Sequence, residues 1–214
     1  MKKETFEQEL KAHDFRVAIF GSARIKKGDK NYKMIYNLAK MIGKQNLDIV
    51  TGGGPGIMDA ATEGHLAGNK NHSSHALGLL IKLPKEQRSA KHLDIKHEFD
   101  HFSERLDNFM ILSNAVVVAP GGLGTLLELF YTWQLVQVKQ ICDIPIILIG
   151  DHWDELINWV KNRVLKNKFI NKEDMHPIFF AKNEKEAMEL INTTYNFYKK
   201  GGKNACLNIK KYKI

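Results

Sequence analysis

The chain has little cysteine: its 214 residues include two, Cys142 and Cys206, which are far apart in the sequence. They form no C-x-x-C pair, so neither a zinc site nor a disulfide framework is indicated, and a reducing cytoplasm is the expected compartment. No run approaches the ~18 to 20 apolar residues that a membrane helix needs, and the N-terminal segment lacks the apolar core of a signal peptide. We therefore expect a cytoplasmic protein without a membrane partner.

The signatures of several enzyme classes are also missing. The nine histidines form no H-x-x-x-H pair on one helical face, which is the arrangement that zinc hydrolases use. There is no G-x-S-x-G elbow and no Cys/His signature for covalent acyl chemistry. Hydrophobic residues make up 43% and charged residues 26%, which is ordinary for a globular protein. We expect no metal and no cofactor.

The charge is unbalanced, with a formal net value of +8. The lysines are spread along the chain except for a basic tail at 199–214, which follows a single expected domain at 1–198. A charge run at a terminus is typical of a solvated, disordered tail, so no nucleic-acid partner is expected. The excess of positive charge also favours anionic small substrates through long-range attraction.

Apolar runs rich in β-branched residues alternate with helical patterns along the chain. This alternation predicts an α/β fold, a parallel sheet covered by helices. The expected strands are Val17–Phe20, Asp48–Thr51, Ala76–Leu83, Ala115–Ala119 and Pro145–Ile149. The expected helices are Phe6–His13, Tyr32–Lys44, Ile57–Ala67, Ser103–Ser113, Leu123–Gln140, Trp153–Lys166 and Glu184–Tyr198.

Three of the expected strands end in glycine-bearing turns, at residues 21–23, 52–56 and 121–124. In a doubly wound sheet, ligands bind outside the carboxyl ends of the strands, where the strand order reverses. We therefore expect the three turns to converge on one crevice. Ser22 in the first turn is a candidate donor to a phosphate or a ribose hydroxyl. The second turn has four glycines in five positions, for which close helix-to-strand packing is the alternative explanation.

The most informative stretch, PGGLGTLLE at residues 120–128, follows an apolar run and opens a helical pattern. The first turn of a helix presents N–H groups without internal partners and carries partial positive charge, so anions bind there. Gly121, Gly122 and Gly124 remove side chains that would keep a phosphate away from the backbone. Thr125 adds a hydroxyl donor in the same turn.

Glu128 lies one helical turn beyond this phosphate loop. A phosphate would repel its carboxylate, so a useful role for it lies further out, at the sugar and its glycosidic carbon. The pattern indicates a nucleotide whose ribose is being worked on. Arg105, at the start of the helix that leads into the Ala115 strand, is expected at the same crevice, although a lone arginine on a helix is more often a surface residue.

Four features in this order and spacing resemble the LOG family of cytokinin riboside 5'-monophosphate phosphoribohydrolases, many long labelled "lysine decarboxylase". They are Gly52–Met58, the expected loop Leu83–Gln87, Arg105 and Pro120–Glu128. The likeness covers roughly Arg16 to Lys166, and P-G-G-x-G-T-x-x-E is its specific motif. Nothing in the chain identifies a lysine Schiff-base site for pyridoxal phosphate, so the decarboxylase label has no chemical basis here.

The resemblance implies a Rossmann-like fold, doubly wound with helices on both faces, that is usually dimeric. The implied activity is hydrolysis of the N-glycosidic bond of a nucleoside 5'-monophosphate to free base and ribose 5-phosphate. The implied catalytic pair is Arg105 and Glu128. The expected phosphate and ribose contacts are Gly21, Ser22, Gly53, Gly54, Gly121, Gly122, Gly124 and Thr125. The expected base-side contacts are Met58 and Glu86, although simple solvent exposure is an alternative for Glu86.

The chain departs from the family at Leu106, where members commonly have lysine, and at Leu127, where many have a second glutamate. Substrate choice among cytokinin nucleotides, AMP and other monophosphates stays open. Two other functions share the fold: a binding protein such as a molybdenum-cofactor carrier or nucleotide sensor, and a nucleic-acid-processing protein supported by net charge alone. The segment Leu126 to Val138 is apolar on more than one face, so it is either a central buried helix or one packed against a partner. We expect a homodimer.

Overall fold

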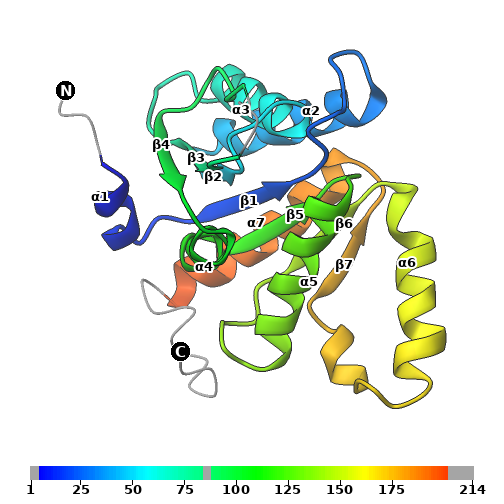
Figure 1. Cartoon of the computed structure of the whole chain (residues 1–214). Helices are drawn as coiled ribbons and strands as arrows, with labels where there is room; N and C mark the ends of the chain where they lie inside the picture. Colours follow the sequence, from blue (N-terminus) through cyan, green and yellow to red (C-terminus); the bar gives the residue numbers. More distant parts are fainter. Residues whose placement is uncertain (1–4, 84–87, 202–214) are drawn as a thin grey trace.

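The computed structural model describes residues 5–83 and 88–201 of the chain. Within these residues, parallel strands form one seven-stranded sheet in the order β4-β3-β2-β1-β5-β6-β7 (Figure 1). The strands are β1 (Arg16–Phe20), β2 (Asp48–Thr51), β3 (Ala76–Ile81), β4 (Ile95–Phe99), β5 (Ala115–Val118), β6 (Ile146–Ile149) and β7 (Ile178–Ala181). The strand order reverses between β1 and β5, which pair directly from Val17↔Ala115 to Phe20↔Val118. This junction is the topological switch point of the sheet.

Helices cover both faces of the sheet (Figure 1). They are α1 (Phe6–Lys11), α2 (Lys30–Lys44), α3 (Ile57–Gly68), α4 (Phe102–Leu112), α5 (Leu123–Gln137), α6 (Asp154–Trp159) and α7 (Glu184–Gly201). The chain continues from α6 into a π-helical turn at Val160–Leu165. One apolar core contains side chains of α2, α3 and α7, and the other contains side chains of α1, α4, α5 and α6. The expected doubly wound, Rossmann-like α/β fold is confirmed.

Strand β1 illustrates why the central strands form where the sequence predicts them. Val17 and Ile19 belong to the core with α2 and α3, whereas Ala18 and Phe20 belong to the core with α4 and α5. Successive side chains of a strand point to opposite faces, so a strand covered on both faces is apolar throughout. Every residue of β1 is buried, including Arg16 at its first position.

Two strands, β4 and β7, are not predicted from the sequence, and both lie at edges of the sheet. In β4 only Ile95 and Phe99 are fully buried, with the polar triplet Lys96-His97-Glu98 between them. An edge strand has one neighbour and a more exposed surface, so it lacks the continuous apolar run that marks the central strands. Strand β3 ends at Ile81, two residues before its expected end.

Three details at the periphery correct or limit the expectations. Helix α7 extends to Gly201, so Lys199 and Lys200 are helical rather than part of a tail, and residues 202–214 lie outside the described part. Cys142 is buried and disulfide-bonded, contrary to the expectation from the cysteine spacing. Among the described residues, no helix has the length and apolar content required to cross a membrane.

Candidate active site

Backbone hydrogen bonds tie together the turns that follow β1, β2 and β5. The Ser22 N–H donates to the Pro120 carbonyl at 3.1 Å, and the Ile57 N–H donates to the Ser22 carbonyl at 3.0 Å. Gly56 has φ +73°, and a Cβ there would lie 2.3 Å from the Ser22 oxygen. Only glycine allows this close approach with this backbone conformation. The turn after β1 is therefore fixed between the other two.

A cavity of about 1280 Å³ opens at these turns, beside the switch point. The predicted site residues in the described part of the chain all line it: Gly21, Ser22, Gly53, Gly54, Met58, Arg105, Gly121, Gly122, Gly124, Thr125 and Glu128. The structure thus brings together residues that are more than a hundred positions apart in the sequence. Glu86 lies outside the described residues.

The N-terminus of α5 forms one wall of this cavity. Gly122 is its N-cap residue, with an extended backbone, and the Leu126 N–H donates to the Gly122 carbonyl at 2.9 Å. The N–H groups of residues 123–125 precede this first helical bond and so have no helical acceptor. A Cβ at Gly122 or Gly124 would meet no atom within 4 Å. Open space beside unpaired N–H groups and a positive helix end is what an anion requires.

Gly21 and Gly121 are glycines for a different reason. A Cβ on Gly121 would lie 2.1 Å from Thr125 Oγ1, and one on Gly21 would lie 2.6 Å from Ile57 Cγ2. Both glycines permit tight packing within the loops, which is a structural reason for glycine at these positions beside the predicted phosphate contact. Thr125 is itself 4% exposed, held against Gly121.

Arg105 on α4 and Glu128 on α5 meet in the wall of the cavity. The Arg105 Nη2 lies 3.5 Å from Glu128 Oε1, and the two side chains are 9% and 12% exposed. The Arg105 Nε donates to the Leu79 carbonyl at 2.7 Å, and its guanidinium carbon lies 5.1 Å from the centre of the Phe109 ring. Arg105 is therefore an oriented, buried residue and not a surface arginine.

Burial sets the electrostatics of this pair. It raises the pKa of Glu128 to about 7, although the positive charge of Arg105 acts in the opposite direction. Burial likewise lowers the pKa of Arg105, against the effect of Glu128. A separation of 3.5 Å exceeds the usual length of a charge-assisted hydrogen bond, so both groups retain capacity for a ligand. A perturbed acid with a specific partner in a cavity marks a functional-site candidate.

On another side of the cavity, Met58 packs over the glycines of the turn after β2. Its Sδ lies 3.2 Å from the Gly54 nitrogen, and Asp59, the next residue, forms an ion pair with Arg88. Sequence reasoning missed several lining residues: Arg24, Lys82, Arg88, Ser89, Glu98 and Phe102. Glu98 belongs to the unpredicted strand β4, for which the flanking apolar residues Ile95 and Phe99 were the available signal.

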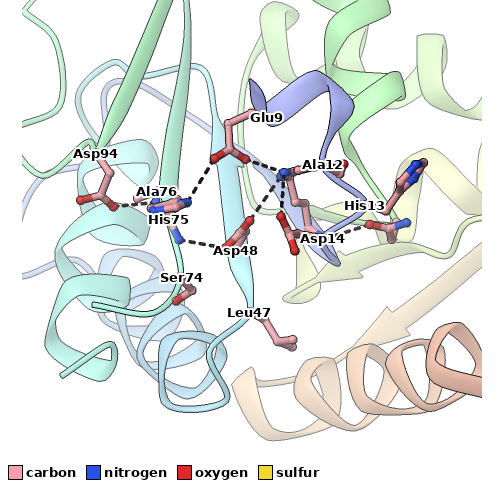
Figure 2. A network of polar contacts seen from close by, with 12 residues as sticks. Glu9, Ala12, His13, Asp14, Leu47, Asp48, Ser74, His75, Ala76 and Asp94 are labelled. Atoms are coloured by element: carbon pink, nitrogen blue, oxygen red, sulfur yellow. Dashed lines mark hydrogen bonds and ion pairs between the residues drawn. The ribbon is translucent and has the colours of Figure 1, made fainter. Parts of the chain in front are cut away.

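At the amino end of the sheet, Glu9, Asp48 and His75 place one ligand atom each within 4.8 Å of one another (Figure 2). The Arg16 Nη2 pairs with Glu9, and the Arg16 Nε lies 3.3 Å from Asp48 Oδ2. The His75 Nδ1 lies 3.2 Å from Glu9 Oε1. The Arg16 guanidinium therefore already serves as the cation of this cluster, and we assign it no metal.

The fold and the cavity define a Rossmann-like α/β protein with an open helix N-terminus and an arginine–carboxylate pair in a cavity at its switch point. The chain belongs to the family described as "possible lysine decarboxylase", the LOG family, whose model matches residues 58–191. The expected family membership is confirmed.

Two relatives illustrate the family. The "probable cytokinin riboside 5'-monophosphate phosphoribohydrolase LOGL6" of Oryza sativa subsp. japonica is 28% identical over 183 residues, covering 82% of this chain and 70% of the relative. The "pyrimidine/purine nucleotide 5'-monophosphate nucleosidase" of Escherichia coli K12 is 26% identical over 131 residues, covering 57% of this chain and 28% of the relative. Both bear the names of enzymes that act on nucleotides.

Solved structures support the fold. The molybdenum cofactor binding protein of Rippkaea orientalis superposes with a TM-score of 0.63 at 19% identity, covering 85% of this chain and 98% of that one. DNA processing protein A of Helicobacter pylori superposes with a TM-score of 0.57 at 16% identity, covering 88% and 85%. At these identities the likeness concerns the fold alone.

Proposed function

We propose that this protein hydrolyses the N-glycosidic bond of a nucleoside 5'-monophosphate, an AMP-like or cytokinin nucleotide, to free base and ribose 5-phosphate. The observation that carries the proposal is the buried Arg105–Glu128 pair, in the same cavity as the α5 N-terminus and one helical turn beyond it. The names of the relatives, a phosphoribohydrolase and a nucleosidase, support the reaction class.

The 5'-phosphate binds at the N-terminus of α5 in this proposal. The N–H groups of residues 123–125 and the open space at Gly122 and Gly124 supply donors and access. The turn after β1, which carries the Ser22 hydroxyl, lies beside this wall because the Ser22 N–H donates a hydrogen bond to the Pro120 carbonyl. Binding the phosphate, which does not react, holds the sugar in place and so lowers the barrier at the glycosidic carbon.

Glu128 acts at the sugar. Departure of the base builds positive charge on the anomeric carbon, and a nearby carboxylate stabilises this oxocarbenium-like state while it binds ribose hydroxyls or orients water. The buried position strengthens that effect because little water screens the charge. With a pKa of about 7, Glu128 is substantially ionised at neutral pH.

Arg105 is the second catalytic residue of the proposal. Its Nε is occupied by the Leu79 carbonyl, so the terminal Nη groups are the ones that remain for the ligand. They hold the phosphate or donate towards the departing base. Their charge also favours the ionised form of Glu128 against the effect of burial.

The test is to incubate purified protein with AMP, other nucleoside monophosphates and isopentenyladenosine monophosphate, and to follow free base by chromatography. Glu128→Gln preserves the shape of the side chain and removes its charge, so we expect base release to fall by about 10²- to 10³-fold while nucleotide binding is kept. Equal release by the variant would overturn the role of Glu128. Tight binding by the wild type with no release from any nucleotide would favour a carrier or sensor.

We also propose that the protein forms a homodimer through α5. Leu123, Leu127 and Phe130 are 87%, 46% and 42% exposed and follow one another at helical spacing, so they form an apolar stripe. Such stripes on a surface mark contact sites. Light scattering should give a dimer for the wild type and a monomer for Leu127→Glu/Phe130→Glu. Phe197→Glu, at an exposed position on α7, should leave the dimer intact; a monomeric wild type contradicts the proposal.

A further inference from the structure

A second cavity of about 610 Å³ adjoins the first. It lies between the turn after β1, the first turns of α3 and residues 88–92. The two cavities share four lining residues: Ala23, Arg24, Ile25 and Arg88. A molecule bound in the first cavity therefore has the second directly beside it. The proposed hydrolysis of a monophosphate does not use this space.

The lining of the second cavity is strongly basic. Among the described residues, this lining contains five lysine and arginine side chains, Arg24, Lys26, Lys27, Arg88 and Lys91, and two carboxylates, Asp59 and Glu63. The described lining residues therefore carry an excess of three formal positive charges. Such an excess attracts anions and repels metal ions.

Both carboxylates in this lining are already neutralised by neighbours. Asp59 pairs with Arg88. Glu63 accepts from Lys27 Nζ at 2.6 Å and from the Tyr32 hydroxyl at 2.8 Å, and these contacts lower the pKa of Glu63. The acidic groups are thus not available to balance the remaining cations.

Arg24, Lys26 and Lys91 form no ion pair with any residue in the described ranges 5–83 and 88–201. They come from two separate segments, the turn after β1 and the loop before β4. The N-terminus of the twelve-residue helix α3 adds partial positive charge at Gly56. An anion with several acceptor oxygens can satisfy donors that arrive from several directions.

We infer that the second cavity is a phosphoryl-binding subsite, which takes either a second phosphoryl group of a nucleotide held in the first cavity or a free phosphate-type anion. Binding of a second phosphoryl group of a nucleotide rests on the proposed nucleotide site, whereas binding of a free anion does not. A base is disfavoured here, since the lining is dominated by charged side chains, with Ile25, Tyr32 and Pro55 as its larger apolar surfaces.

Calorimetric titration of the Glu128→Gln protein tests the inference without turnover. The probes are AMP, ADP, adenosine 3',5'-bisphosphate and inorganic pyrophosphate, the last added both to free protein and to protein saturated with AMP. Lys26→Ala/Lys91→Ala, added to Glu128→Gln, removes two cations of the cavity that form no ion pair within the described residues. Lys70→Ala/Lys161→Ala removes two exposed lysines that line neither cavity and is the matched control.

If the phosphoryl group is attached, ADP or the bisphosphate binds about tenfold more tightly than AMP, and the cavity variant loses this gain while its AMP affinity is unchanged. If the anion is free, pyrophosphate binds the AMP-saturated protein, and the cavity variant abolishes that binding. Both effects weaken as salt is added, since the cations are exposed.

The inference is overturned if no probe binds more tightly than AMP and pyrophosphate does not bind. It is also overturned if the control variant loses as much affinity as the cavity variant. Failure of the proposed hydrolase is a separate outcome, because it appears as absent base release by the wild type. Lysine-dependent pyrophosphate binding in a protein that releases no base would keep the subsite and reject the hydrolase.

Discussion

Two buried arginines lie at opposite ends of the same sheet, and their surroundings differ. Arg16, at the amino end of β1, has Glu9, Asp14 and Asp48 around it and is 2% exposed. Arg105, near the carboxyl ends of the strands, is 8% exposed and has one carboxylate, Glu128, at 3.5 Å. Arg16 is surrounded by carboxylates, whereas Arg105 has one carboxylate neighbour and lines a cavity.

A raised pKa does not distinguish the two ends. Burial raises the pKa of Asp48 to about 6 and that of Glu128 to about 7. The difference lies in pairing and access: neither Arg16 nor Asp48 lines the two cavities, whereas Arg105 and Glu128 line the larger one. Incomplete pairing beside open space, more than burial of charge, therefore separates a candidate reactive site from a structural cluster.

The largest expected effect is on stability at the amino end. Arg16→Met should lower the free energy of unfolding by about 3 to 5 kcal/mol, because the buried Glu9 and Asp48 lose their arginine partner. Urea denaturation measures this, and Arg16→Lys, which keeps a charge, should lose less. Base release per folded molecule should stay at the wild-type level. If Arg16→Met is as stable as the wild type, the structural role of Arg16 is contradicted.

At the carboxyl end we expect a large effect on activity and a small effect on stability. Arg105→Met should reduce base release by about 10²- to 10³-fold, since a donor aimed at the reacting ligand is lost. Its stability should change little at pH 6, where the buried Glu128 can be protonated and needs no cation. Activity and urea denaturation are measured on the same sample. A loss of stability as large as that of Arg16→Met would show that the two arginines have the same role.

The pH profile sharpens the assignment of Glu128. If the carboxylate form is reactive, kcat should rise about tenfold per pH unit below pH 7 and level off above it, because the pKa of Glu128 is raised to about 7. The residual activity of Glu128→Gln should lack this rise. A wild-type profile flat between pH 5 and 8 would exclude Glu128 as the titrating group.

The smallest effect contrasts two glycines of the α5 loop. Gly124→Ala places a methyl group in open space, so folding should be unaffected while AMP affinity falls about tenfold. Gly121→Ala meets Thr125 and should instead lower stability by about 1 to 3 kcal/mol. Calorimetric titration and thermal unfolding separate the two outcomes. Equal effects of both substitutions on AMP affinity would contradict the distinction.

Much of the fold is predictable from short segments of sequence. The central strands β1 and β5 are covered on both faces and so appear as apolar runs, and the glycine turn before α5 identifies a helix start. The edge strands β4 and β7 lack such an apolar run and were not predicted. Because β4 was not predicted, its residue Glu98 was not recognised as lining the cavity. Arg24 and Arg88 were missed because no local pattern distinguishes a lysine or arginine beside a cavity from one on the surface.

The sequence alone determined the α/β class, the family and the candidate residues Arg105 and Glu128, because these depend on local periodicity and on a motif of adjacent residues. Only the tertiary structure decided that these two side chains lie 3.5 Å apart and buried, and that Arg16 is enclosed by carboxylates. It also placed a basic cavity beside the first one. Burial and pairing depend on segments distant in sequence, and the pKa of Glu128 follows from that burial.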